Sequence, residues 1–176
     1  MNILLILAIF WPALAGLVIF LTPGCKENKQ LRSEENKQAN LELLETAVSQ
    51  MTDGDYEACI TTFESIDTVG FSDDDLAKYN SLKAELYPKA ADAYYTKGKS
   101  DFLSKNMTEA KTDLEAALKY ASNENFVDDI YYYLGQIAEG ENDTASAKKY
   151  YNKIISEYPD SNQIGNAKNA LEGLKE

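Results

Sequence analysis

Apolar side chains recur at steps of three and four residues along much of the chain, which is the period of an amphipathic helix. Residues 128–161 show this most clearly, with two apolar stripes separated by a polar turn at 139–144. The stripes consist of Tyr131, Leu134 and Ala138, and then of Ala147, Tyr151 and Ile154. The segment therefore predicts two antiparallel helices packed face to face, the second of which ends at Pro159.

Two residues without bulk stand within these stripes, Gly135 in the first and Ala147 in the second. Helices approach each other closely only where one side lacks bulk and a large side chain of the partner fills the gap. We therefore expect Gly135 and Ala147 to lie where the two predicted helices touch.

This arrangement resembles the tetratricopeptide repeat, in which an aromatic residue, Leu-Gly, an Ala, a second aromatic residue and a terminal Pro follow in order. The matching residues are Tyr131, Leu134, Gly135, Ala147, Tyr151 and Pro159. The ending YPDSNQIGNAKNALEGL is also similar to the closing segment of repeat proteins of the bacterial cell envelope, of the outer-membrane assembly lipoprotein and Tol-Pal accessory type.

A single unit of this kind cannot bury its apolar face alone, so further copies are expected. Residues 91–124 align with it, and residues 40–73 align less closely, with Cys59 in a small-residue position. The residues that align in the middle copy are Tyr94, Gly98, Ala110, Leu114 and Ala117. The sequence thus predicts a helical repeat domain at 40–176, with repeats at about 40–73, 91–124 and 128–161 and a capping helix at 162–175.

An irregular stretch separates the first two predicted repeats. Ser72 precedes three aspartates, which is typical of a helix start because the serine caps the helix and the acids favour its positive end. Pro88 either starts a new helix or kinks a long one that continues to about Lys105. The absence of a turn residue before Pro88 favours the long helix.

Residues 1–25 contain no charged side chain, and about 20 apolar residues are enough to cross a bilayer. They predict a transmembrane or signal-anchor segment, with membrane contact through residues 1–22. The stretch at 21–25 also resembles the lipoprotein signal, so lipidation of Cys25 is the alternative anchor. A charged run follows at 26–39, which predicts a solvated linker or an exposed continuation of the membrane helix.

The predicted orientation rests on conflicting signals. Basic residues follow the apolar segment and none precedes it, which by the positive-inside rule favours a cytoplasmic repeat domain. The similarity of the ending to envelope proteins favours export. We expect a membrane protein, single-pass or lipid-anchored, with the repeat domain on the extracytoplasmic side.

Composition narrows the candidate functions. The net charge of −12, from 29 acidic and 17 basic residues, repels phosphate backbones and makes nucleic acid an unexpected partner. Histidine is absent, which removes the commonest general base and metal ligand. No phosphate-binding loop, calcium loop or nucleophile elbow is found. We therefore expect no enzymatic activity, catalytic residue, cofactor, metal site or small-molecule substrate.

The twelve tyrosines exceed the number that the packing positions use. Residues one step round the first helix of each repeat face the concave groove of a solenoid, where tyrosine offers large contact area at low entropic cost. These predicted groove residues are Leu44, Val48 and Met51, then Tyr95, Lys99 and Phe102, then Tyr132 and Gln136. The alternative is that part of this set is core between adjacent helices.

The predicted fold class is all-α, with an N-terminal transmembrane helix followed by a short tetratricopeptide-like α-solenoid. The predicted function is a membrane-tethered scaffold or adaptor that binds a protein or peptide partner through its concave helical face. The alternative is a structural subunit of a cell-envelope assembly that uses its outer face, because its own long helix fills the concave one.

Overall fold

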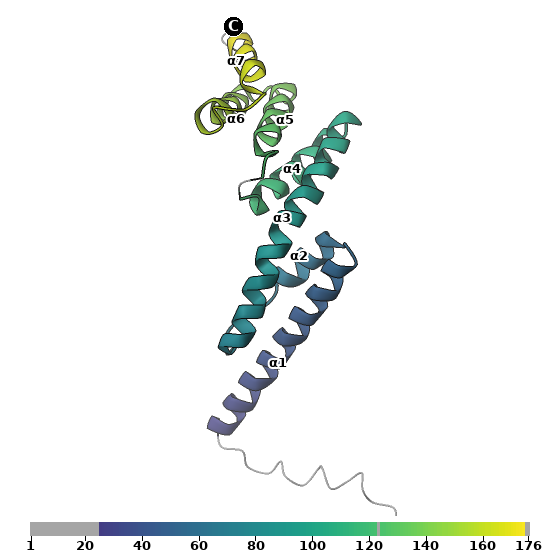
Figure 1. Cartoon of the computed structure of the whole chain (residues 1–176), viewed down its shortest axis with the longest axis vertical. Coiled ribbons are helices and arrows are strands. Elements are labelled where there is room, and N and C mark those ends of the chain that lie inside the picture. Colours follow the sequence, from purple (N-terminus) through teal and green to yellow (C-terminus); the bar gives the residue numbers. More distant parts are fainter. Residues whose placement is uncertain (1–24, 123, 175–176) are drawn as a thin grey trace, which may run out of the picture.

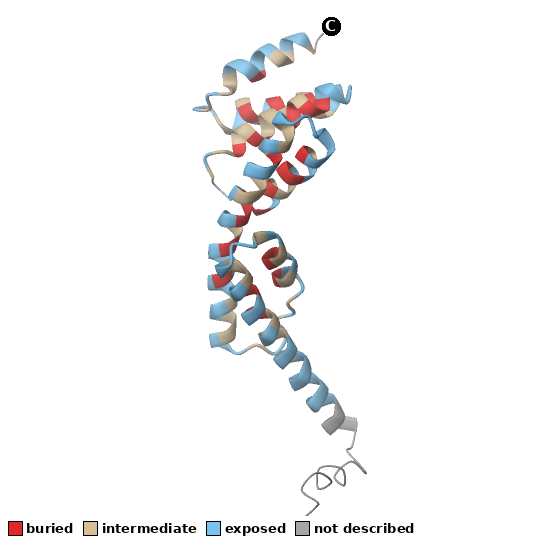
Figure 2. Ribbon diagram, turned by 90° about the vertical axis from the view of Figure 1, so that its right-hand side faces the viewer, coloured by how far each residue is buried: buried red, intermediate tan, exposed pale blue. Residues whose placement is uncertain are grey.

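The computed structural model describes residues 25–122 and 124–174, which form seven α-helices (Figure 1). In chain order these are α1 (Cys25–Thr52), α2 (Tyr56–Glu64), α3 (Asp73–Leu103), α4 (Met107–Tyr120), α5 (Val127–Gly140), α6 (Thr144–Glu157) and α7 (Ile164–Gly173). The described part of the chain is therefore all-α. Helix α1 includes the run predicted as a solvated linker or an exposed helical continuation, and residues 29–39 of it project from the body with mostly exposed side chains (Figure 2).

The transmembrane helix in the predicted fold class requires a correction. Within residues 25–122 and 124–174, no helix combines the length and the apolar character that a membrane crossing needs. The longest helices, α1 and α3, have 28 and 31 residues but carry charged side chains, which are costly in hydrocarbon. The segment predicted to span the membrane lies outside the described residues, except for Cys25 at the start of α1.

Three helix pairs, α1 with α2, α3 with α4 and α5 with α6, are joined by turns of the same backbone geometry. In each turn three successive N–H groups donate to carbonyls four, three and five residues earlier. The middle residue is left-handed in every case: Gly54 has φ 77°, Lys105 66° and Asn142 61°. Equivalent positions in the three pairs therefore lie 51 and then 37 residues apart.

In the second and third pairs the two helices approach closely at a glycine of the first helix. Gly98 of α3 faces Leu114 of α4, and a Cβ on Gly98 would lie 2.8 Å from Leu114 Cγ. Gly135 of α5 faces the ring of Tyr151 of α6, and a Cβ on Gly135 would lie 2.7 Å from Tyr151 Cζ. Neither contact leaves room for a side chain at the glycine. The prediction that Gly135 lies where the two helices touch is confirmed.

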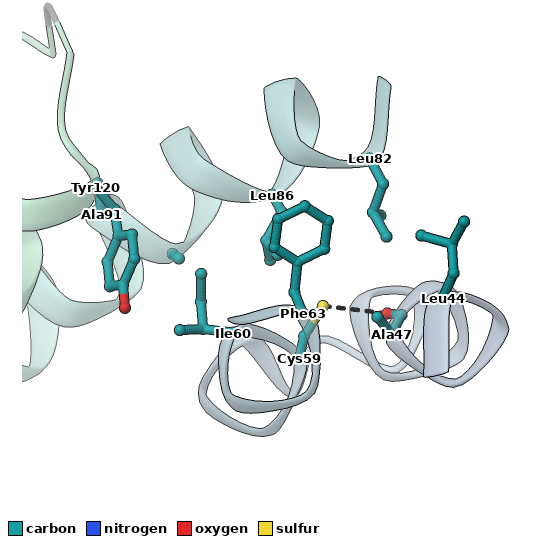
Figure 3. Close-up of a cluster of buried hydrophobic side chains, with 10 residues drawn as sticks. Leu44, Ala47, Cys59, Ile60, Phe63, Leu82, Leu86, Ala91 and Tyr120 are labelled. Carbon is teal, nitrogen blue, oxygen red and sulfur yellow. Dashed lines mark hydrogen bonds between the residues drawn. The ribbon is translucent and has the colours of Figure 1, made fainter. Parts of the chain in front are cut away.

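In the first pair Ala47 holds the equivalent position, 51 residues before Gly98. The thiol of Cys59 is fully buried and donates to the carbonyl oxygen of Ala47, with 3.1 Å between sulfur and oxygen (Figure 3). Burial raises the pKa of the Cys59 thiol, so it stays neutral near pH 7. Cys59 is a packing residue, as its place in the repeat predicted.

The core consists of three successive clusters, as expected of a solenoid whose units contact only their neighbours (Figure 2). Among the described residues, the first joins α1, α2 and residues 82–91 of α3 and includes Tyr120 at the end of α4. The second joins α3, α4 and α5, and the third joins α5, α6 and α7. Helix α3 contributes to the first two clusters because it continues through Pro88. Of the two alternatives for Pro88, the long helix is therefore confirmed.

A charge pair links α3 to α4 beside the Gly98 contact. Lys97, which stands where the repeat pattern usually has Leu, donates from Nζ to Asp113 Oδ1 at 3.1 Å. Asp113 is only 5% exposed, and its Oδ2 has no hydrogen-bond partner among the described residues. The hydrogen bond to Asp113 raises the pKa of Lys97, so the lysine stays charged. Lys97 thus offsets part of the cost of burying this carboxylate.

We predict that Lys97→Leu lowers the free energy of unfolding by about 2 kcal/mol or more, because it leaves the buried Asp113 carboxylate unpaired. The double variant Lys97→Leu/Asp113→Leu should recover most of this loss, because it removes the buried charge as well. Urea unfolding followed by circular dichroism measures both effects. Additive effects in the double variant would show that the two charges do not interact.

We also predict that Gly135→Ala lowers the free energy of unfolding by about 1–3 kcal/mol, since its Cβ overlaps the Tyr151 ring. The matched control is Gly140→Ala on the same helix, where nothing lies within 4 Å of an added Cβ. That substitution should be neutral or stabilising, by up to about 1 kcal/mol, because alanine favours helix over glycine. Equal midpoints of urea unfolding for the two variants would contradict the close contact.

Candidate partner-binding site

The eight predicted groove residues occupy equivalent faces of α1, α3 and α5. Their sequence separations match the offsets of 51 and 37 residues that the turns define. The equivalent sets are Leu44, Tyr95 and Tyr132, then Val48, Lys99 and Gln136, then Met51 and Phe102. The structure gives these sets different surroundings, because a different helix lies beside each face.

The first part of the set lines a real hollow. Leu44, Val48 and Met51 of α1 lie beside the first half of α3, and the space between the two helices is about 320 Å³. Leu44 and Leu82 are buried and point toward one another (Figure 3), whereas Val48 is 47% exposed. The remaining lining residues are Glu45, Lys78, Ser81 and Glu85. The α1/α3 hollow, as we call it, thus has an apolar floor and a charged rim.

The second part of the set packs against the chain itself. The Tyr95 ring stacks on Phe126, with ring centroids 4.6 Å apart and planes at 2°, and Phe102 lies 4.9 Å from the ring of Tyr133. The Tyr95 hydroxyl donates to Asp129 Oδ2 at 3.2 Å. Burial, and then the Asp129 carboxylate, raises the pKa of Tyr95, so the phenol stays neutral. These contacts correspond to the alternative in which part of the set is core between adjacent helices.

The remaining residues of the set are partly exposed and held by their neighbours. Lys99 Nζ lies 5.6 Å from the centroid of the Tyr95 ring, which is a cation–π arrangement. Gln136 Nε2 donates to the Tyr132 hydroxyl at 3.3 Å, and the Tyr132 ring lies 6.0 Å from that of Tyr151. A part in partner binding for these side chains stays a prediction.

Sequence reasoning missed two features of this face. The first is the α3 wall of the hollow, for which the apolar stripe through Leu82 and Leu86 was the available signal. The second is the carboxylate of Asp129, which accepts from Tyr95 on one oxygen and from Gln163 Nε2 on the other, at 2.6 Å. Asp129 on α5 is thereby hydrogen-bonded to α3 and to the start of α7. Each partner lies 34 positions from Asp129 in the sequence.

Within residues 25–122 and 124–174, no group of three or more cysteine, aspartate or glutamate side chains is placed to hold a metal ion. The α1/α3 hollow combines an apolar floor with Lys78 and two glutamates on its rim.

We predict that Tyr95→Ala lowers the free energy of unfolding by about 2–4 kcal/mol, because it removes the stack on Phe126 and the hydrogen bond to Asp129. Lys99→Ala, one turn away on the same face, should change it by about 0.5 kcal/mol or less. Thermal unfolding followed by circular dichroism compares the two. If Tyr95→Ala unfolded at the temperature of the unchanged chain, the stack would not be structural.

Comparison with known proteins supports the repeat pattern in the second half of the chain. Residues 91–124 match a family model described as tetratricopeptide repeat, and so do residues 129–161. The first match covers the second half of α3 with α4, and the second covers α5 with α6. No curated protein and no solved structure matches the chain. Nothing in these comparisons supports the predicted similarity to the outer-membrane assembly lipoprotein and Tol-Pal accessory type. The two matches support a tetratricopeptide repeat protein, with repeats at 91–124 and 129–161.

Proposed function

We propose that this protein is a non-catalytic scaffold that binds a segment of a partner protein in the α1/α3 hollow. Tetratricopeptide repeats are typically protein-interaction modules, which supports the general function. The observation that carries the proposal is Val48, a large apolar side chain that is 47% exposed between the buried Leu44 and Leu82. Binding is favourable when an apolar side chain of the partner covers this exposed surface, because apolar area is then removed from water.

The dimensions and charges of the hollow indicate what kind of segment fits. A space of about 320 Å³ accommodates a few side chains rather than a whole helix. The rim carries Glu45, Lys78 and Glu85, so charges of both signs flank the apolar floor. The segment that suits the hollow best has one or two apolar anchor residues between polar or charged neighbours.

A second candidate is a structural subunit that assembles through its outer surface. The packing of Tyr95 and Phe102 against α5 favours this alternative, because these rings are not free to hold a peptide. It differs from the first candidate in that the α1/α3 hollow plays no part. A substitution within the hollow therefore distinguishes the two.

We predict that Val48→Asp weakens binding of the partner to the full chain by about tenfold or more, since it places a charge against the apolar surface that the partner buries. The matched control is Val69→Asp in the loop between α2 and α3, because Val69 is 75% exposed and does not line the hollow. The immobilised chain would be used to capture partners, and binding of the captured partner to each variant would then be titrated.

Both variants should keep the helical circular dichroism spectrum of the unchanged chain, since neither valine is buried. A partner that binds the Val48→Asp and Val69→Asp variants equally well would refute the hollow as the binding site and favour assembly through another surface.

A further inference from the structure

A second hollow lies at the other end of the repeat array, between α6 and α7, with a volume of about 460 Å³. Its walls combine two lysines and an amide with one apolar and one acidic side chain. The lining residues are Lys148, Asn152, Lys168, Leu171 and Glu172. This α6/α7 hollow shares no residue with the α1/α3 hollow, so binding at one does not require binding at the other.

The repeat geometry shows what Lys148 lacks. Its equivalent one repeat earlier, 37 residues back, is Lys111 on α4. Lys111 Nζ lies 2.6 Å from Glu141 Oε2, in the turn between the helices of the following pair. Lys148 has no carboxylate within 4.0 Å among the described residues, and neither has Lys168. Lys111 thus joins its own unit to an acid of the next unit. The ammonium group of Lys148 has no such carboxylate among the described residues, so it can pair with a carboxylate of another molecule.

Helix α7 occupies the place that α5 holds in the previous unit. The backbone bonds that start α5, from Val127 and Ile130, recur 37 residues later from Ile164 and Ala167. By the same offset Leu171 corresponds to Leu134, and Glu172 corresponds to Gly135. Leu134 is 1% exposed in the cluster that α4 and α5 form, whereas Leu171 is only partly buried in the next cluster.

A further helix of the same kind is not expected to cover this face of α7. The α5 and α6 contact depends on the missing side chain of Gly135, and Glu172 places a long charged side chain at the equivalent position. The hollow therefore suits a less closely packed occupant, such as an extended or loosely docked peptide.

Charge distinguishes this end from the rest of the molecule. The chain has a net charge of −12, yet α6 and α7 together hold four lysines and two glutamates. Neither helix has an acid in its first turn. An acidic segment is thus repelled by most of the surface and attracted here, which directs it to the α6/α7 hollow.

We propose that the α6/α7 hollow binds an acidic segment of a partner protein. Carboxylates of the segment pair with Lys148 and Lys168, as Glu141 pairs with Lys111, and Asn152 donates a further hydrogen bond from its amide. An apolar side chain of the segment covers Leu171. Because Glu172 lines the same hollow, acids of the segment must sit on the lysine side of it.

The test uses a fluorescein-labelled, N-acetylated peptide of alternating glutamate and leucine pairs, titrated with the full chain in a fluorescence anisotropy assay. The unchanged chain should bind the peptide, with affinity that falls as salt is added. Lys148→Glu should weaken binding by about tenfold or more, because it removes a charge-assisted hydrogen bond and adds repulsion. The same peptide with glutamine in place of glutamate should not bind.

The matched control is Lys149→Glu, which makes the same charge change at the next residue of α6 but does not line the hollow. It should weaken binding by less than about threefold, because only long-range attraction is lost. Equal weakening by both variants, or no binding by the unchanged chain, would overturn the proposal. Self-association that Lys148→Glu abolishes, without peptide binding, would also overturn it and assign the hollow to a second copy of the chain.

Discussion

The close approach of two helices at one small residue is the contact on which the rest of the structure depends. Ala47, Gly98 and Gly135 recur at this position, and in the later pairs a large side chain of the second helix lies directly on the glycine. Each pair leaves apolar side chains that the pair itself does not bury. The next helix along the chain buries these side chains. The core of the described residues is therefore a series of clusters rather than one cluster.

The length of α3 follows from the same requirement and produces the α1/α3 hollow. The offset between the first and second units is 51 residues, against 37 between the second and third. Helix α3 begins at Asp73, which is 17 residues before position 90, the equivalent of the start of α5 at Val127, and its first half contacts α1 and α2. This added half supplies Lys78, Leu82 and Glu85, the wall that faces Val48. The stretch that interrupts the regular repeat in the sequence thus supplies one wall of the α1/α3 hollow.

The sequence predicts a contact well when both residues belong to one helix pair, and poorly when they belong to different pairs. The contact of Gly135 with Tyr151 joins residues 16 positions apart across one turn, and the spacing of small and large residues predicted it. The face to which Tyr95 and Val48 belong could also be predicted, because helical period determines it. What lies opposite that face could not, since Phe126 and Leu82 come from other helices. Charge on α1 and α3 likewise explains why long helices here are not membrane spans.

The two hollows reflect two ways in which a solenoid ends. At the first unit, the added half of α3 covers Leu44 but leaves Val48 exposed, so the remaining surface is apolar. At the last unit, Glu172 stands where the second and third pairs have Gly98 and Gly135. The two lysines of the α6/α7 hollow lack a carboxylate partner among the described residues. An apolar opening selects a partner by shape and a cationic one by charge. On the two proposals, one scaffold would hold two dissimilar segments at once, because the two hollows differ in chemistry and share no lining residue.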